Sequence, residues 1–552
     1  MRRRPRRSSS GFRLHSNVHS FNAIPAGYRE CDTVTAPVPD PLAALTAAHP
    51  SKTAIIEGDR RLSYAAFNAL VNRYANVLVG LGVRAGTKVT WCGRNSTEVV
   101  ALIAALRKAG AVGVPLNYRL SPEEASYVVA NADSALVLFD VEQAPQLELA
   151  AREAGGVRGW LAFRSGTGQV PDWASDLDAE AARSPETEPA AAGDDPAAGT
   201  AMFYTSGTTG KPKGVVRGQP DPEIVIGLVT EIGYQPGDVY LTTGPLYHSG
   251  PMSFMLIVQQ MGGTVVVMRD FDPERWLELV EEHRVTATFS APTPIRRVLD
   301  LPDEVIAARD LSSLRRFIAN AAPWPFELKR RYVEKIGEGS LFEVYGSTEL
   351  GVDTILRPED QMRKPGSCGR PAPGIEIALF DDKGERVEEP RVPGDLYVRS
   401  KATFDAYYKA DRKFEDAKLG EWLTVGDIAY RDDEGFYYIC DRRTDMIISG
   451  GVNIYPAEIE AVLTAHPAIA DAAVFGIPSQ EWGESVHAAI VVHPGAEASD
   501  AELDAFCREH LASYKVPRGY DRIAEVPRNP SGKALKRQLR DPYWESQETK
   551  IG

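Results

Sequence analysis

The sequence predicts an α/β protein: a large N-terminal α/β domain of several packing units, with a small β subdomain, followed by a small α+β C-terminal domain. Three observations support this. Its 552 residues exceed what one hydrophobic core organises, since roughly 150 residues form one unit. Helix and strand patterns alternate from 62 to 140. A stretch from about 374 to 430 is rich in short strands and Gly/Pro turns.

The alternating segment begins with a helix. Apolar residues recur at helical spacing over 67–78 behind Ser63, a residue type that caps helix N-termini. A strand over 88–92, a helix over 97–108 and a strand over 111–116 follow. The order helix, strand, helix, strand is typical of α/β folds.

Two later helices carry explicit start signals. Ser121 and Glu124 have the spacing of a capping box, and so do Ser499 and Glu502 in the C-terminal part. Between them, residues of about 185–199 form a run of Pro, Ala, Gly, Glu and Asp without periodicity, which predicts a surface linker inside the N-terminal domain.

Composition excludes several classes of protein. A net charge of −14 argues against nucleic-acid binding, which needs a basic face. No segment reaches the roughly 18 to 20 apolar residues of an integral membrane helix. The five cysteines show no C-x-x-C spacing, which predicts a reduced, cytoplasmic protein without a zinc site. Residues 1–30, basic at first and then serine-rich, are expected to be a disordered tail of unknown role.

The most informative segment runs from Tyr204 to Gly214. Its glycines let backbone N–H groups approach a ligand closely, its hydroxyls add donors, and its two lysines add charge. Together these groups suit a polyphosphate. The segment lacks the spacing of a Walker A loop, so it predicts a different kind of nucleotide site.

This loop resembles the phosphate-binding signature of the adenylate-forming superfamily, which contains acyl-CoA synthetases, peptide-synthetase adenylation domains and luciferases. Four further motifs of that family follow in the expected order, and the resemblance covers about 42–540. They are Tyr345 to Glu349, Thr424 to Asp427, Asp441 to Glu460, and Asn529 to Lys533. The chain is most similar to a fatty or aromatic acyl-CoA synthetase.

The resemblance implies a reaction and a domain division. A carboxylic acid would displace pyrophosphate from ATP with Mg²⁺ to give an acyl-adenylate, and coenzyme A would then accept the acyl group, as in fatty acid metabolism. The N-terminal adenylation domain would span 31–443. The C-terminal domain, 444–552, would rotate about Thr444, where the family often has Asp or Lys. A hinge needs tolerated backbone angles more than charge, so we expect it to work.

The resemblance also assigns roles to individual residues. Thr205 and Glu349, both hard oxygen donors, would bind the magnesium ion. The remaining nucleotide contacts implied are Ser206, Gly207, Thr208, Thr209, Gly210 and Lys213 for phosphate, Ala321, Ala322 and Tyr345 around adenine, Gly346 and Thr348 elsewhere in the nucleotide site, Asp427 at the ribose, and Arg442 at the ribose or a phosphate. Gly450 and Gly451 would line the path of the pantetheine arm.

Two residues would act on the reacting groups. Lys533 would neutralise negative charge that builds up as the carboxylate attacks the α-phosphorus, and so lower the barrier. His248 would lie beside the carboxylate as a neutral imidazole or as a gate for the second substrate. With Glu349, these are the predicted catalytic residues.

Several alternatives stay open. No acidic residue lies between Leu241 and Gln260, which disfavours an amino acid substrate. A stand-alone enzyme that loads an acyl-carrier protein, a luciferase-like oxidation and an inactive nucleotide-binding homologue remain. A homodimer is also open. Four apolar residues are expected to line the acyl pocket, which favours fatty, aromatic or alicyclic acids: Met252, Phe254, Phe317 and Val344.

Overall fold

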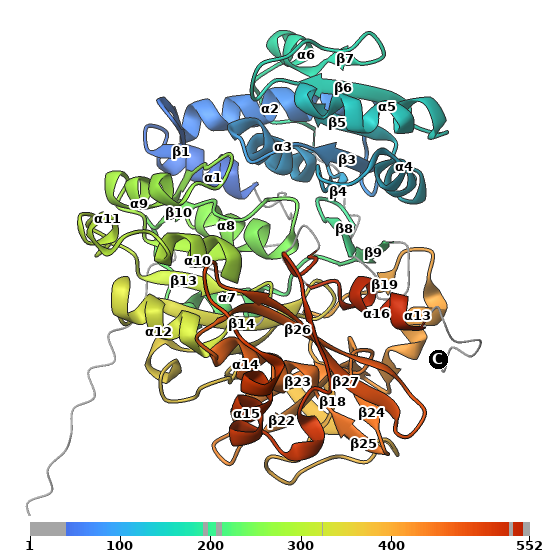
Figure 1. The fold of residues 1–552 in the computed structure, drawn as a ribbon. Helices are drawn as coiled ribbons and strands as arrows, with labels where there is room; N and C mark the ends of the chain where they lie inside the picture. The colour runs from blue at the N-terminus through green and yellow to red at the C-terminus, as the bar shows by residue number, and fades with distance from the viewer. Residues whose placement is uncertain (1–39, 191–196, 206–211, 323, 529–533, 545–552) are drawn as a thin grey trace, which may run out of the picture. The chain divides into compact units, whose positions relative to one another are not determined.

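A computed structural model describes residues 40–190, 197–205, 212–322, 324–528 and 534–544. The predicted tail at 1–30 therefore lies outside the described residues. Figure 1 follows the chain through five sheets and the helices around them. Among the described residues, no helix combines the length and apolar character needed to cross a membrane.

The largest sheet has nine strands, and six neighbouring strands at its centre run parallel. Antiparallel partners close both edges. In spatial order the strands are β16 (Arg370–Pro371), β15 (Gly351–Leu356), β14 (Leu341–Ser347), β13 (Arg316–Ala319), β12 (Ala287–Ser290), β10 (Val239–Leu241), β11 (Thr264–Val266), β1 (Thr53–Glu57) and β2 (Arg60–Ser63).

A second, parallel sheet is formed by the alternating segment. Its order is β4 (Val112–Leu116), β3 (Lys88–Cys92), β5 (Leu136–Asp140), β6 (Gly159–Phe163) and β7 (Ser175–Asp176). The helices of this N-terminal region are α1 (Pro41–Ala48), α2 (Tyr64–Gly80), α3 (Thr97–Lys108), α4 (Pro122–Asn131), α5 (Ala144–Glu153) and α6 (Leu177–Arg183). The α/β prediction is confirmed here, including the Ser63 cap of α2 and the capping box of Ser121 and Glu124.

Three further sheets complete the fold. One is β19 (Ala406–Tyr407), β9 (Lys213–Val216) and β8 (Met202–Thr205). The strand-rich stretch contributes most of the second: β20 (Lys418–Leu419), β21 (Trp422–Leu423), β18 (Gly394–Arg399), β22 (Asp427–Arg431) and β23 (Tyr437–Arg442), with β17 (Glu376–Phe380) on β18. The third is β25 (Val452–Ile454), β24 (Ile447–Ser449), β27 (Gly483–Val492) and β26 (Ile469–Ser479), with β28 (Tyr520–Arg522) on β27.

The remaining helices cover these sheets. They are α7 (Pro222–Ile232), α8 (Ser249–Gln260), α9 (Pro273–Glu282), α10 (Pro292–Leu299), α11 (Asp303–Ala307), α12 (Phe326–Lys335), α13 (Asp411–Asp416), α14 (Pro456–Ala465), α15 (Asp500–His510) and α16 (Lys536–Trp544). Helix α15 begins with the predicted capping box of Ser499 and Glu502.

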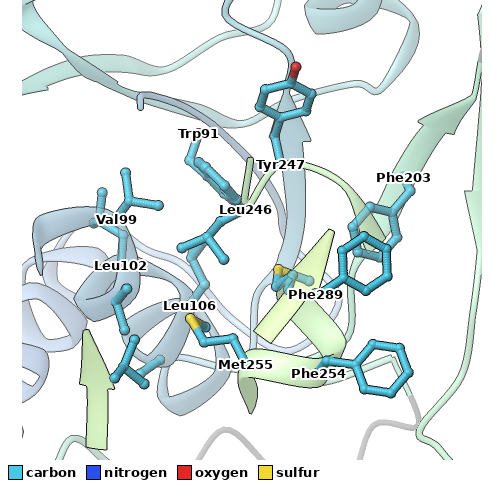
Figure 2. Close-up of a cluster of buried hydrophobic side chains, with 14 of the residues drawn as sticks. Trp91, Val99, Leu102, Leu106, Phe203, Leu246, Tyr247, Phe254, Met255 and Phe289 are labelled. Atoms are coloured by element: carbon cyan, nitrogen blue, oxygen red, sulfur yellow. The ribbon is translucent and has the colours of Figure 1, made fainter. Parts of the chain in front are cut away.

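The largest apolar core lies between the nine-stranded sheet and the parallel five-stranded sheet, and it includes residues of α3 and α8. Figure 2 shows Leu106 of α3 beside Met255 of α8, with Phe203, Phe254 and Phe289 on the same side of the cluster. Helices from two separate α/β units therefore share one core, which fixes α8 and the loop before it.

Part of the predicted linker is held against the N-terminal unit. Lys108, buried in α3, donates to Asn68 at 2.7 Å and to Asn72 at 2.8 Å, and its Nζ lies 2.6 Å from Glu188. The carbonyl of Pro185 accepts from Asn76. Residues 191–196 of the linker lie outside the described residues. A buried lysine needs such partners, because an isolated charge in the interior is costly.

The structure corrects one expected pocket residue. Phe317 lies on β13 and is fully buried among Trp276, Trp324 and Tyr332 in a second core cluster. Its neighbour Ile318 packs into the main core instead. Side chains alternate across a strand, so Phe317 points to the sheet face opposite to the main core.

Phe317→Leu should lower the free energy of unfolding by about 1–2 kcal/mol, because the smaller side chain leaves a void among three aromatic rings. Urea denaturation would measure this. The matched control is Ile226→Ala on α7, where the side chain is 64% exposed, and a change within about 0.5 kcal/mol is expected. Equal losses in both variants would contradict the assignment.

Candidate active site

The glycine-rich loop is anchored by an antiparallel pair of strands. Thr205 at the end of β8 pairs with Lys213 at the start of β9. The hairpin register therefore fixes where the loop leaves and re-enters the sheet. Its central residues, which include the predicted contacts Ser206, Gly207, Thr208, Thr209 and Gly210, lie outside the described residues.

A carboxylate lies directly beside this hairpin. Glu349 follows β14 and accepts hydrogen bonds from the Thr205 hydroxyl at 3.3 Å and from the Tyr407 hydroxyl at 3.2 Å. The Nζ of Lys213 lies 5.3 Å from the centroid of the Tyr407 ring. Two segments far from Glu349 in the sequence thus donate to one of its carboxylate oxygens.

The donors at this point fit a magnesium ion. Within the described part of the chain, no cluster of three or more His, Cys, Asp or Glu is placed to hold a metal. Glu349 and Thr205 offer only hard oxygen atoms, and Mg²⁺ usually keeps several waters and completes its shell with phosphate oxygens. A site with one carboxylate and one hydroxyl suits a metal that arrives with a nucleotide.

A second polar group is built on β14, β22 and β23. The Tyr345 hydroxyl donates to Asp427 at 2.6 Å, and the Arg442 Nε lies 3.3 Å from the other Asp427 oxygen. Asp427 and Arg442 are register partners on adjacent strands. Burial, followed by the charge of Asp427, raises the pKa of Tyr345 well above its usual value. The tyrosine therefore stays a neutral donor that holds one oxygen of Asp427.

The loop after β13 adopts an unusual backbone. Ala321 has φ of +74°, a left-handed conformation that costs a residue with a Cβ about 1–2 kcal/mol. Asn320 stabilises it locally: its side-chain oxygen accepts from the Ala321 amide, and its Nδ2 donates to the Val344 carbonyl at 2.5 Å. Strained non-glycine residues of this kind occur often at ligand sites.

His248 ends the loop that enters α8. Its ring packs on Tyr247 with centroids 4.3 Å apart. Burial, and secondarily the charge of Arg119, lowers the pKa of His248 to about 4. The next residue, Ser249, is hydrogen-bonded to Thr348 through their hydroxyls at 2.9 Å. The imidazole is therefore neutral at physiological pH and is tied, through its neighbour, to the segment that carries Glu349.

All of these groups line one large cavity. The predicted residues found on its wall are Thr205, Lys213, His248, Ala321, Ala322, Tyr345, Gly346, Thr348, Glu349, Asp427 and Arg442. Gly346 is required where it stands, because a Cβ there would lie 2.0 Å from the Gly351 carbonyl oxygen. The structure thus gathers residues on or next to strands of three sheets around one space.

The other predicted site residues are placed differently. Gly450 and Gly451 form the turn between β24 and β25, with φ of +59° and +78°. A Cβ on Gly450 would come within 2.8 Å of the Trp482 ring. Lys533 lies outside the described residues.

The apolar part of the cavity includes Met252, Phe254 and Val344, as expected, whereas Phe317 is absent from it. Sequence reasoning missed Tyr407, and it missed Phe203 and Phe289, which line the same space. Tyr407 reaches Glu349 only because β19 pairs with β9. No motif spacing reports such a pairing.

Comparison with known proteins decides the family. The family model described as AMP-binding enzyme matches residues 42–408, and the model of its C-terminal domain matches residues 458–533. The chain belongs to the AMP-binding enzyme family. It is therefore an adenylate-forming ligase, as the motifs indicate.

Two curated relatives of this AMP-binding enzyme illustrate the range. Long-chain-fatty-acid–CoA ligase FadD13 of Mycobacterium tuberculosis is 35% identical over 88% of this chain and 94% of its own. Fatty acid–[acyl-carrier-protein] ligase ScoC of Streptomyces coeruleorubidus is 32% identical over 91% and 95%.

A solved structure shows the same architecture. The o-succinylbenzoate CoA synthetase MenE of Bacillus subtilis, in complex with the acyl-adenylate OSB-AMP, is 31% identical. It matches 91% of this chain and 98% of its own with a TM-score of 0.78. The expectation of a large N-terminal domain and a smaller C-terminal domain is confirmed.

His248 should make this AMP-binding enzyme less stable in mild acid. Its folded pKa of about 4 lies below the unfolded value of about 6.5, so the unfolded state takes up the proton first. The stability contribution is complete above about pH 6.5 and is lost as the pH falls toward 4.

Thermal midpoints measured from neutral pH to about 4.5 should therefore fall more steeply for the parent than for His248→Gln, which has no imidazole to protonate. Parallel curves for the two proteins would show that the imidazole titrates alike in both states.

Proposed function

We propose that this enzyme activates an apolar carboxylic acid with ATP and Mg²⁺ to form acyl-AMP and pyrophosphate, and then transfers the acyl group to coenzyme A. The observation that carries the first step is the convergence of Thr205, Tyr407 and Glu349 with Asp427 in one cavity. Groups suited to a metal ion and to a nucleoside thus line the same cavity.

Each part of ATP would meet a matching group. Glu349 and Thr205 would hold the metal ion, which neutralises phosphate charge. Asp427 would accept hydrogen bonds from the ribose hydroxyls, since Tyr345 and Arg442 already fix its orientation. The ring of Tyr345 and the small Ala321 and Ala322 would enclose adenine.

The reacting carboxylate would lie between His248 and the phosphates. A neutral imidazole does not compete with Lys533 for the carboxylate, and it donates a hydrogen bond without adding charge. Lys533 would place its ammonium group at the phosphorus centre, where charge builds up in the transition state. Once pyrophosphate leaves, the mixed anhydride carries AMP as a good leaving group for thiol attack.

The acid is expected to be apolar. Met252, Phe254 and Val344 line the cavity together with Phe203 and Phe289. The stretch from Leu241 to Gln260 has no carboxylate to pair with an α-ammonium group. A long-chain fatty acid is the first candidate, because FadD13 is named for that substrate.

Coenzyme A as acceptor is supported by the turn at Gly450 and Gly451. Trp482 packs against Gly450 and keeps 37% of its surface exposed. The guanidinium of Arg518 lies 5.1 Å from the centroid of the Trp482 ring. An exposed indole next to a cation suits a nucleotide base with its phosphates, while the glycines leave room for a thin pantetheine arm.

The predicted domain division at 443/444 would place the hinge at Thr444. The Arg443 guanidinium donates to two residues of the proposed N-terminal domain, Asp395 of β18 at 2.5 Å and Asp382 at 3.2 Å. The Arg443 amide also donates to Gly426. Since Arg443 is tied to these residues, Thr444 would absorb a rotation of the C-terminal domain, inside a turn where the Asp445 and Met446 amides donate to the Arg442 carbonyl. A cytoplasmic location and a homodimer remain predictions.

A carrier-protein thiol is the second candidate acceptor, favoured by the similarity to ScoC, which is named as a fatty acid–[acyl-carrier-protein] ligase. Both acceptors present a phosphopantetheine thiol, so the chemistry of transfer is the same. They differ in whether a nucleotide or a protein surface is recognised.

Pyrophosphate release should be measured over acids of differing chain length and ring content, with and without coenzyme A. We expect release with apolar acids and an acyl-CoA product only when coenzyme A is present. Lys533→Ala should reduce acyl-AMP formation by about 100-fold or more, because it removes the cation at the reacting phosphorus. If pyrophosphate were released but no acid gave an acyl-CoA product in the presence of coenzyme A, the choice of coenzyme A as acceptor would be wrong.

Trp482→Ala should separate the two half-reactions. We expect the KM for coenzyme A to rise by about tenfold, because stacking on an aromatic face contributes about 1–3 kcal/mol, while the rate of acyl-AMP formation stays the same. Tyr514→Ala is the matched control, since Tyr514 is also an exposed aromatic residue of the C-terminal region. An unchanged KM in Trp482→Ala would exclude stacking on this ring.

A further inference from the structure

A half-buried arginine lines the same cavity as Glu349 and contacts the Glu349 segment. Arg217 follows β9, and its Nη1 donates to the Thr348 carbonyl at 3.2 Å while its Nη2 donates to the Ala402 carbonyl at 2.5 Å. We call the Arg217 guanidinium and these two carbonyls the Arg217 clasp. Glu349 follows Thr348 directly, and its carbonyl accepts from the Phe404 amide at 2.7 Å. The clasp therefore joins the two backbone segments that meet at Glu349.

The space around the guanidinium is closed by a glycine. Gly351 has φ of +97°, and a Cβ there would lie 3.3 Å from Arg217 Nη2 and 3.5 Å from the Ala402 oxygen. The first contact is tighter than ordinary van der Waals packing, the second lies within it, and the backbone angle disfavours any side chain. The hairpin of β14 and β15 is thus shaped to admit the arginine.

The clasp also supplies positive charge among carboxylates. Asp353 on β15 is fully buried, and neither of its carboxylate oxygens has a hydrogen-bond partner among the described residues. Burial, then Asp427, raises the pKa of Asp353 well above its usual value, and Arg217 opposes this shift. Burial lowers the pKa of Arg217, while Asp353, Glu349 and Asp405 raise it. The half-buried Arg217 thus provides positive charge near three acidic groups.

We propose that Arg217 is a positioning residue that holds Glu349 in the geometry needed to bind the metal. The inference rests on the proposed function, because it takes Glu349 as a magnesium ligand. Arg217 acts through the backbone of Thr348 and of the 402–404 loop, and the latter leads to Tyr407, which donates to the Glu349 carboxylate. Groups that orient a metal ligand commonly change metal affinity when they are removed.

This role predicts different effects on the binding of two ligands, Mg²⁺ with ATP and AMP without metal. Mg²⁺ with ATP depends on the carboxylate of Glu349, whereas AMP without metal depends on Tyr345 and Asp427. Loss of the clasp should weaken the first and leave the second unchanged. A merely structural arginine would weaken both together, and so would an arginine that touches the nucleotide itself.

The test compares Arg217→Met with Arg217→Lys. For each, the Mg²⁺ concentration giving half-maximal pyrophosphate release is measured, together with the Kd for AMP by calorimetry. We expect the Mg²⁺ requirement of Arg217→Met to rise on the order of 10- to 100-fold, and that of Arg217→Lys to rise less, because lysine keeps the charge and reaches one carbonyl. The Kd for AMP should change by less than about threefold.

Arg330→Met serves as the matched control, because Arg330 is exposed on α12 and pairs only with Glu327 and Glu334 among the described residues. Its Mg²⁺ requirement should match that of the parent. The proposal is overturned if Arg217→Met keeps the parental Mg²⁺ requirement, or if its affinity for AMP falls as much as its affinity for Mg²⁺. If Arg217→Met does not fold, the same two readings on Arg217→Lys decide.

Failure of the proposed function would look different. A parent protein that releases no pyrophosphate with any acid would remove the adenylation assignment itself. The Mg²⁺ dependence of ATP binding, followed by tryptophan fluorescence in parent and Arg217→Lys, would then still test the clasp. An equal Mg²⁺ dependence in the two proteins would overturn it.

Discussion

The site depends on the Glu349 carboxylate, at which three segments that are far apart in the sequence meet. Glu349 receives hydrogen bonds from Thr205 at the end of β8 and from Tyr407 on β19. These contacts bring the glycine-rich loop, the β14–β15 hairpin and the strand-rich region to the same point. If the carboxylate moved, the Thr205 end of the glycine-rich loop would no longer be tied to the segment that follows β14. Its position is therefore the constraint on which the remaining geometry rests.

The polar groups around this point follow a consistent rule. Those that are buried without an opposite charge stay neutral, as the shifted pKa values of His248 and Tyr345 indicate. Asp427, which would meet ligand directly, is already paired with Arg442. Groups held this way need little reorganisation when charge develops on a substrate. A protein with a net charge of −14 can thus accommodate a polyanion, because the local field differs from the total.

The two half-reactions proposed for this enzyme put opposite demands on the chain. Adenylation needs a cation at the α-phosphorus, whereas thiol transfer needs an open approach to the acyl carbonyl. The residues on the N-terminal side of the proposed hinge are fixed: Arg443 pairs with Asp395 and Asp382. The turn at Gly450 and Gly451, six and seven residues beyond Thr444, carries no side chain bulk of its own. A rotation at one backbone position could exchange one set of groups for the other.

The amino-acid sequence is enough to predict the local elements and the family. The capping boxes of Ser121 and Ser499, the strand at 88–92 and the helix at 97–108 follow from side-chain chemistry within a few residues, which a linear sequence displays. The motif residues from Thr205 to Arg442 were found for the same reason, since each motif is contiguous.

The sheet face that Phe317 occupies and the partners that support Glu349 become visible only in the folded chain. The apolar character of Phe317 is the same on either face of β13, and only the helices packed on each side distinguish them. Arg217 and Tyr407 meet the 348–349 segment across more than 50 residues of sequence. Contacts of that kind depend on strand pairing and on the space left by Gly351, and neither quantity is a property of a short stretch of sequence.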